Sequence, residues 1–101
     1  MTNEAAELIN YMDNTDILYP QRVAIEKSLN RKIKAGKFDP NKSVKLWLYW
    51  VENGAKEYCK DYGGTWHVIF STKIRLEAAT YIANNFISQL PDPRLRDFLA
   101  R

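Results

Sequence analysis

The residues best suited to chemistry are the single cysteine and the single histidine, Cys59 and His67. A cysteine beside a histidine can act as a nucleophile with its general base, but the chain must bring His67 back onto the segment of Cys59 and add a third, orienting group. Neither residue lies in an HExxH or multi-cysteine pattern, so the sequence predicts no metal site. We expect Cys59 to be a small buried hydrophobe and His67 a hydrogen-bonded loop residue.

Two further patterns could serve catalysis but have simpler interpretations. The run GGT at residues 63–65 looks superficially like a phosphate loop, yet the GxxxxGK[ST] spacing is missing and no strand clearly precedes it, so we interpret it as a helix stop. The acidic residues Glu52, Glu57 and Asp61 alternate with lysines, which is typical of a solvated helix face with modest ion pairing. The sequence therefore predicts a protein that is not an enzyme and needs no cofactor.

Positive charge is concentrated in one part of the chain. Residues 1–19 carry four acidic side chains and no basic one, whereas residues 22–45 carry eight basic and two acidic ones. Either the basic segment forms a footprint for an anionic partner, or the acidic segment packs beside it. The cations that could neutralise the phosphates of DNA or RNA are Arg22, Lys27, Arg31, Lys34, Lys37, Lys42 and Lys45. An ordinary solvated basic face would look the same, and no helix-turn-helix spacing is distinctive.

Glycines, prolines and capping residues divide the chain into helices. The clearest start is Asp39 followed by Pro40, because an N-cap carboxylate accepts from unpaired first-turn amides and proline lacks an amide that would stay unpaired there. Gly36 and the glycine pair at 63–64 stop the helices that precede them. We expect helices at about residues 3–12, 20–35, 40–62 and 72–90, and a last short one in the tail at 91–101.

These elements predict an all-α fold, a compact bundle of four to five helices with short loops in one domain of residues 1–101. Residues 65–70 alternate too little to form more than an ordered loop or one short extended segment. The tail at 91–101 either packs back on the bundle or protrudes toward another chain. No segment approaches the ~18 apolar residues of a membrane span and no leader pattern begins the chain, so we expect a cytoplasmic protein that contacts no membrane.

The helix expected at 40–62 carries an aromatic cluster with two groups of residues on its helical wheel. One group is expected to be core and comprises Val44, Leu48, Val51, Ala55, Tyr58 and Tyr62, with Trp47 and Cys59 at its borders. Leu46, Tyr49 and Trp50 lie outside it. If the helix is central, as its length favours, these three are buried and Gly54 lets another backbone approach closely. If it is peripheral, they form an exposed patch for a protein partner or a second copy.

A spaced pattern of residues runs through three segments, LYPQRVAIEKSLNRKIKAGKFDP, VKLWLYWVENGAKEY and FSTKIRLEAATYIANNF. The pattern consists of Leu18, Tyr19, Gly36, Phe38, Asp39, Pro40, Val44, Lys45, Leu46, Trp47, Gly54, Ala55, Lys56, Phe70 and Arg75. On it, the chain resembles, over about residues 17–90, small proteins of unknown function encoded by bacteriophages and related mobile elements. The loop GGTWHVI and the proline-rich tail depart from the pattern.

The resemblance brings no catalytic or binding residues. It implies an accessory protein of the host-cell cytoplasm that binds a host or phage factor, a class that includes inhibitors of host defence. The leading hypothesis is therefore a protein-binding or self-associating module, a candidate homodimer, that uses Leu46, Tyr49 and Trp50. The alternative is a basic DNA- or RNA-binding helical domain that uses the cations of residues 22–45.

Overall fold

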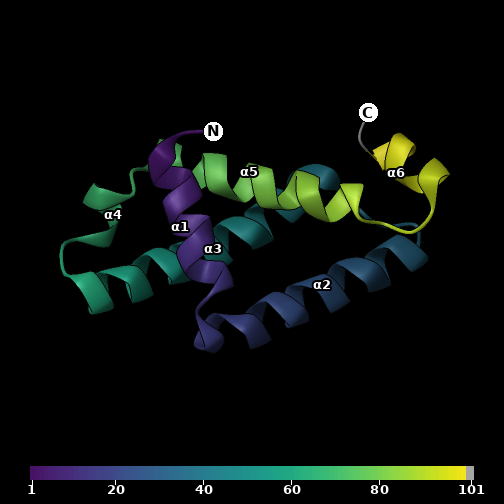
Figure 1. Cartoon of the computed structure of the whole chain (residues 1–101). Coiled ribbons are helices and arrows are strands. Elements are labelled where there is room, and N and C mark those ends of the chain that lie inside the picture. Colours follow the sequence, from purple (N-terminus) through teal and green to yellow (C-terminus); the bar gives the residue numbers. More distant parts are fainter. Residues whose placement is uncertain (100–101) are drawn as a thin grey trace.

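The computed structural model describes residues 1–99, apart from the side chain of Phe98. Its helices are α1 (Asn3–Asp13), α2 (Tyr19–Lys34), α3 (Pro40–Tyr62), α4 (Trp66–Ile69), α5 (Thr72–Ser88) and α6 (Pro93–Leu99), with a 3-10 turn, η1 (Asp16–Leu18), before α2. The described residues contain no strand, which confirms the predicted all-α fold. Figure 1 shows the helices connected by short loops.

The long helix α3 is central to this arrangement. Its 23 residues correspond to about 35 Å of helix. Helices α1, α2, α4 and α5 all contact α3, and α1 also contacts α5. In Figure 1, α3 runs back beside α2 after the turn that joins them, α1 crosses α3 near its middle, and α6 lies beyond the end of α5. The central placement that the length of this helix favours is therefore confirmed.

The helix ends follow the capping residues of the sequence. The carboxylate of Asp39 accepts from the Asn41 amide at 2.9 Å, and Pro40 opens α3. Gly36 has a φ of +69°, a left-handed conformation that suits glycine, and it turns the chain from α2 into α3. The tail helix is also present, because the Asp92 carboxylate accepts from the Arg94 amide at 2.9 Å. It contacts the end of α5, where Arg96 Nη1 donates to the Ser88 carbonyl oxygen at 3.3 Å.

The segment at 65–70 corrects one prediction, because it forms the short helix α4 and not a loop or extended segment. The amides of Val68 and Ile69 both donate to the Thr65 carbonyl oxygen at 3.0 Å. A strand here would need a neighbouring strand to pair its amides, and the described residues offer none. The backbone therefore satisfies its amides locally, in one turn of helix.

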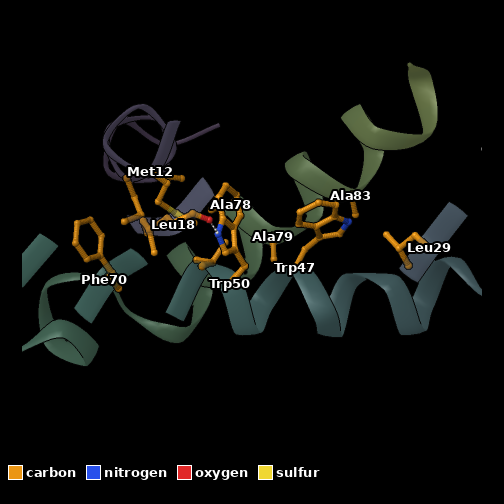
Figure 2. Packing of buried hydrophobic residues seen from close by; sticks show 13 residues of the cluster. Met12, Leu18, Leu29, Trp47, Trp50, Phe70, Ala78, Ala79 and Ala83 are labelled. Carbon is orange, nitrogen blue, oxygen red and sulfur yellow. Dashed lines mark hydrogen bonds between the residues drawn. The ribbon is translucent and has the colours of Figure 1, made fainter. Parts of the chain in front are cut away.

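Side chains from η1 and from four of the helices form the core around α3 (Figure 2). As predicted, Trp47, Val51 and Ala55 are buried. Val44, Leu48 and Tyr58 are only partly buried but pack against this core, whereas Tyr62 is 71% exposed and does not belong to it. Tyr62 is the last residue of α3, and its ring meets the Tyr11 ring of α1 edge to face, with centroids 6.1 Å apart, but most of its surface stays open. Cys59 is half-buried and not fully buried as expected.

Gly54 lies where α1 contacts α3, but the group that approaches it is the Met12 side chain of α1 and not, as the sequence predicted, another backbone. A Cβ atom at this position would lie 2.5 Å from the Cγ atom of Met12, which is itself 98% buried. Since non-bonded carbon atoms cannot lie that close together, any larger residue here would push the Met12 side chain away. The glycine therefore leaves the space that the Met12 side chain fills between α1 and α3.

Candidate functional site

Trp50 does not lie on the surface, so the exposed patch considered for Leu46, Tyr49 and Trp50 does not form. Trp50 is 2% exposed, and its Nε1 donates to the Leu18 carbonyl oxygen at 2.9 Å, the dashed line in Figure 2. The Arg22 guanidinium covers the ring, with 5.8 Å between Cζ and the ring centroid. Leu46 is half-buried against the core, whereas Tyr49 is 65% exposed. Tyr49 is thus the one member of the patch that is open to a partner.

Six of the seven cations predicted to contact nucleic acid are exposed. Within the described chain they make no ion pair with an acidic group, and they form what we call the basic surface: Lys27, Arg31, Lys34, Lys37, Lys42 and Lys45. Arg22 is the seventh and differs from them. It is half-buried and pairs with Asp13 at 3.1 Å and with Glu26 at 3.4 Å. The acidic N-terminal segment therefore neutralises Arg22, and the six others remain available to a partner.

Two helices and one loop place the basic surface at one end of the molecule. On α2, Lys27, Arg31 and Lys34 fall on the face opposite Leu29, which is 1% exposed and anchors the helix in the core. This face extends over about 10 Å, two helical turns. Lys37 follows in the loop, and the first two turns of α3 add Lys42 and Lys45.

The outer face of α3 extends the basic surface in a way that sequence reasoning missed. Lys42, Lys45, Tyr49 and Lys56 are spaced by three, four and seven residues, so they lie along one side of the helix, and all four are exposed. Glu52 and Lys56 lie four residues apart on α3, a spacing that suits an ion pair. In the structure Glu52 instead pairs with Arg75 at 3.2 Å, and Lys56 Nζ lies 5.0 Å from the centroid of the Trp66 ring. The spacing between Lys45 and Lys56 in the sequence is the signal that could have shown that both residues lie on one side of α3.

Comparisons of the chain with protein-family models, with curated protein sequences and with solved structures find no match. Function must therefore be argued from the surface of the molecule itself. The phage-type resemblance and the host or phage partner it implies remain predictions.

The residues considered for catalysis do not come together in the structure. His67 is exposed on α4, with its ring 5.2 Å from that of Trp66, and no hydrogen bond to Cys59 is present in the described part of the chain. Between residues 1 and 99 there is also no group of three or more His, Cys, Asp or Glu side chains placed to hold a metal ion. None of the helices formed by these residues is long and apolar enough to cross a membrane.

A cluster of two tyrosines and two carboxylates joins α1 to the end of α3. The Tyr11 hydroxyl donates to Asp61 Oδ2 at 2.6 Å, and the Tyr58 hydroxyl donates to Glu7 Oε1 at 2.7 Å. Burial and the hydrogen bond to Asp61 raise the pKa of Tyr11 to about 12, and the hydrogen bond to Glu7 is the main reason that the pKa of Tyr58 is also raised. Because each carboxylate binds the neutral phenol, this cluster holds α1 against α3 while both tyrosines are protonated.

We expect this cluster to lose its stabilising effect in alkali. The pKa of Tyr11 is higher in the folded state, at about 12, than the usual 10.0, so its contribution is complete below pH 10 and is lost as the pH rises toward 12. Tyrosinate absorbance near 295 nm should show an ionisation near pH 12 in the folded protein that Tyr11→Phe lacks. Tyr49→Phe, at an exposed site, is the control. An unchanged titration curve for Tyr11→Phe would contradict the assignment.

Proposed function

We propose that the protein is a small non-enzymatic binding protein whose basic surface contacts the phosphate backbone of a nucleic acid. The observation that carries this proposal is the basic surface itself, whose exposed cations no acidic group of the described chain neutralises. Like charges held this close repel one another and attract a cloud of counterions. A polyanion that replaces those counterions releases them, which favours binding.

Tyr49 supports the same proposal. It is exposed on α3 between Lys45 and Lys56, so an aromatic ring lies within a row of cations. Surfaces that bind single-stranded nucleic acid combine these two elements, because cations follow the backbone while a ring stacks on an unpaired base. Single strands are therefore the form of nucleic acid that we expect to bind best.

A protein partner is the second candidate, and one observation favours it. Tyr49 exposes 65% of its surface beside the half-buried Leu46, and tyrosine is enriched among the residues that anchor protein interfaces. An acidic surface on a host or phage protein would also meet the cations of the basic surface. In this alternative, the protein works as the phage-type accessory factor that the resemblance implies.

Fluorescence anisotropy with a labelled single-stranded oligonucleotide tests the proposal. If about four phosphates are neutralised, log K should fall with log salt with a slope of roughly −3. The double substitution Lys27→Glu and Arg31→Glu should weaken binding by about tenfold or more, because it replaces two attractive charges by two repulsive ones. Lys60→Glu with Lys73→Glu makes the same change in net charge near α4 and is the matched control.

Three outcomes separate the candidates. Absence of binding at low salt, or equal losses in the two double variants, would overturn the nucleic-acid proposal. If poly-glutamate of matched charge competes as well as the oligonucleotide, the surface recognises anions in general, and the acidic protein partner becomes the better candidate. If Tyr49→Ala weakens binding of the oligonucleotide but not of poly-glutamate, the result would support stacking of a base on this ring.

A further inference from the structure

A hollow of about 160 Å³ lies where the end of α2 meets the start of α3. Its accessible lining is mostly apolar and includes Leu29 of α2 and Phe38 of the connecting loop. Leu29 lies at the opposite end of the core from Phe70 in Figure 2, so the hollow adjoins that end of the core. An apolar cavity of about 150 Å³ accommodates benzene, so this hollow has room for one six-membered ring.

Three lysines from successive parts of the chain surround the hollow. Lys32 belongs to the last turn of α2, Lys37 to the loop and Lys42 to the first turn of α3. All three are exposed, and none forms an ion pair within the described chain. The one carboxylate of the lining, that of Asp39, caps the Asn41 amide. Three lysines and one aspartate give the lining a net charge of +2.

The position of Lys32 distinguishes this hollow from the outer face of α2. Lys32 follows Leu29 by three residues and lies on the same side of the helix, whereas Lys27, Arg31 and Lys34 lie on the opposite face. Like charges that surround an apolar hollow repel one another, and an anion that binds there removes this repulsion. The hollow therefore favours an occupant that joins an apolar ring to an anionic group.

We propose that the hollow binds one unpaired pyrimidine nucleotide, with its base against Phe38 and Leu29 and its phosphate held by the lysines. This inference rests on the proposed function, because it names the part of a single strand that the basic surface recognises. Flexible lysine side chains bind phosphate as point charges, and aromatic side chains stack on unpaired bases. A pyrimidine has one six-membered ring, the size that the hollow accommodates, whereas the fused rings of a purine would extend beyond it.

Nuclear magnetic resonance of the full chain tests this inference, with UMP as the probe. UMP should shift the methyl resonances of Leu29 and the amide resonances of Phe38 and Ser43, which line the hollow. It should bind at least about fivefold more tightly than uridine, which lacks the phosphate, and than ribose 5-phosphate, which lacks the base. AMP should bind more weakly than UMP because its base is larger. A glutamate–phenylalanine–glutamate peptide, which joins a ring to anionic groups as a protein would, should also bind more weakly.

Two variants separate the phosphate from the base. Lys32→Gln removes one charge at an exposed position and should weaken UMP and ribose 5-phosphate by about threefold or more, but leave uridine unchanged. Phe38→Ala removes part of the apolar lining and should weaken UMP and uridine, but leave ribose 5-phosphate unchanged. Lys73→Gln, at an exposed position on α5, makes the same change in net charge outside the hollow and is the control for Lys32→Gln. Circular dichroism shows whether each variant is folded.

Several results would overturn this inference. They are UMP binding no tighter than that of either fragment, equal binding of AMP, tighter binding of the peptide, and equal effects of Lys32→Gln and Lys73→Gln. The oligonucleotide titration separates this inference from the proposed function. If the oligonucleotide binds but UMP shifts none of the three resonances, the hollow is not a nucleotide site and the proposal for the basic surface stands. If neither ligand binds at low salt, both proposals fail.

Discussion

Trp50→Ala is expected to lower the free energy of unfolding by about 3–5 kcal/mol. The indole is 2% exposed, fills the space between α3 and the start of α2, and loses both its packing and its hydrogen bond to Leu18 in this variant. A cavity of that size cannot collapse fully, because α1 and η1 also pack on α3. Urea denaturation followed by circular dichroism measures the loss, which should appear as a lower midpoint with a similar slope.

Two comparisons separate the hydrogen bond from the packing. Trp50→Phe and Trp47→Phe remove the same atoms, but only the first breaks a hydrogen bond, so Trp50→Phe should be more destabilising by about 1 kcal/mol. Tyr49→Ala, at the exposed position next to Trp50, should change the free energy of unfolding by about 0.5 kcal/mol or less. Equal losses for Trp50→Ala and Tyr49→Ala would contradict the burial of Trp50.

Arg75→Met is expected to lower the free energy of unfolding by about 2–4 kcal/mol. Arg75 is 9% exposed and donates from three nitrogens: Nε to the Phe70 carbonyl oxygen at 2.9 Å, Nη1 to Glu52 at 3.2 Å and Nη2 to the Thr72 hydroxyl at 3.1 Å. Its guanidinium also lies 4.8 Å from the centroid of the Trp66 ring. Methionine keeps the length of the side chain but leaves the Phe70 carbonyl and the Glu52 carboxylate without their donor.

Glu52→Gln and Arg75→Lys are the controls for this prediction. Glu52 is about one-third exposed, so water compensates part of the lost ion pair, and Glu52→Gln should cost less than Arg75→Met. Lysine keeps the charge but cannot donate in three directions from one plane, so Arg75→Lys should fall between them. Urea denaturation ranks the three variants. If Arg75→Met were as stable as Glu52→Gln, the contacts to Phe70 and Trp66 would contribute little.

Local signals in the sequence were sufficient to predict most helix ends. Asp39 with Pro40 starts α3, and the glycine pair ends it, because capping depends on groups within a few residues of one another. Features of this kind need no knowledge of the tertiary structure.

Most of the features that sequence reasoning missed in the core depend on residues far apart in the chain. A helical wheel places Trp50 outside the core stripe, but Leu18 and Arg22 cover it from a segment about 30 residues away. Tyr62 shows the opposite error, because a wheel cannot show how little of the last turn of α3 the neighbouring helices cover. The cations of the basic surface were predicted more completely, because the exposure of a lysine does not depend on contact with another segment of the chain. A pocket lined in part by Trp47 was not foreseen because residues of four helices, α1, α2, α3 and α5, line it together.

The separation of charge along the chain gives the folded molecule an electric dipole moment. The acidic α1 crosses the second half of α3, where Glu7 binds Tyr58, whereas the basic surface lies at the first turns of α3. The molecule measures 43 Å along its longest axis, while the Debye length at physiological salt is about 8 Å. A charged partner therefore exerts a torque on this dipole only at short range. Within that distance, the field of a negatively charged partner should bias the rotational diffusion of the protein, so that the α2–α3 turn contacts the partner first.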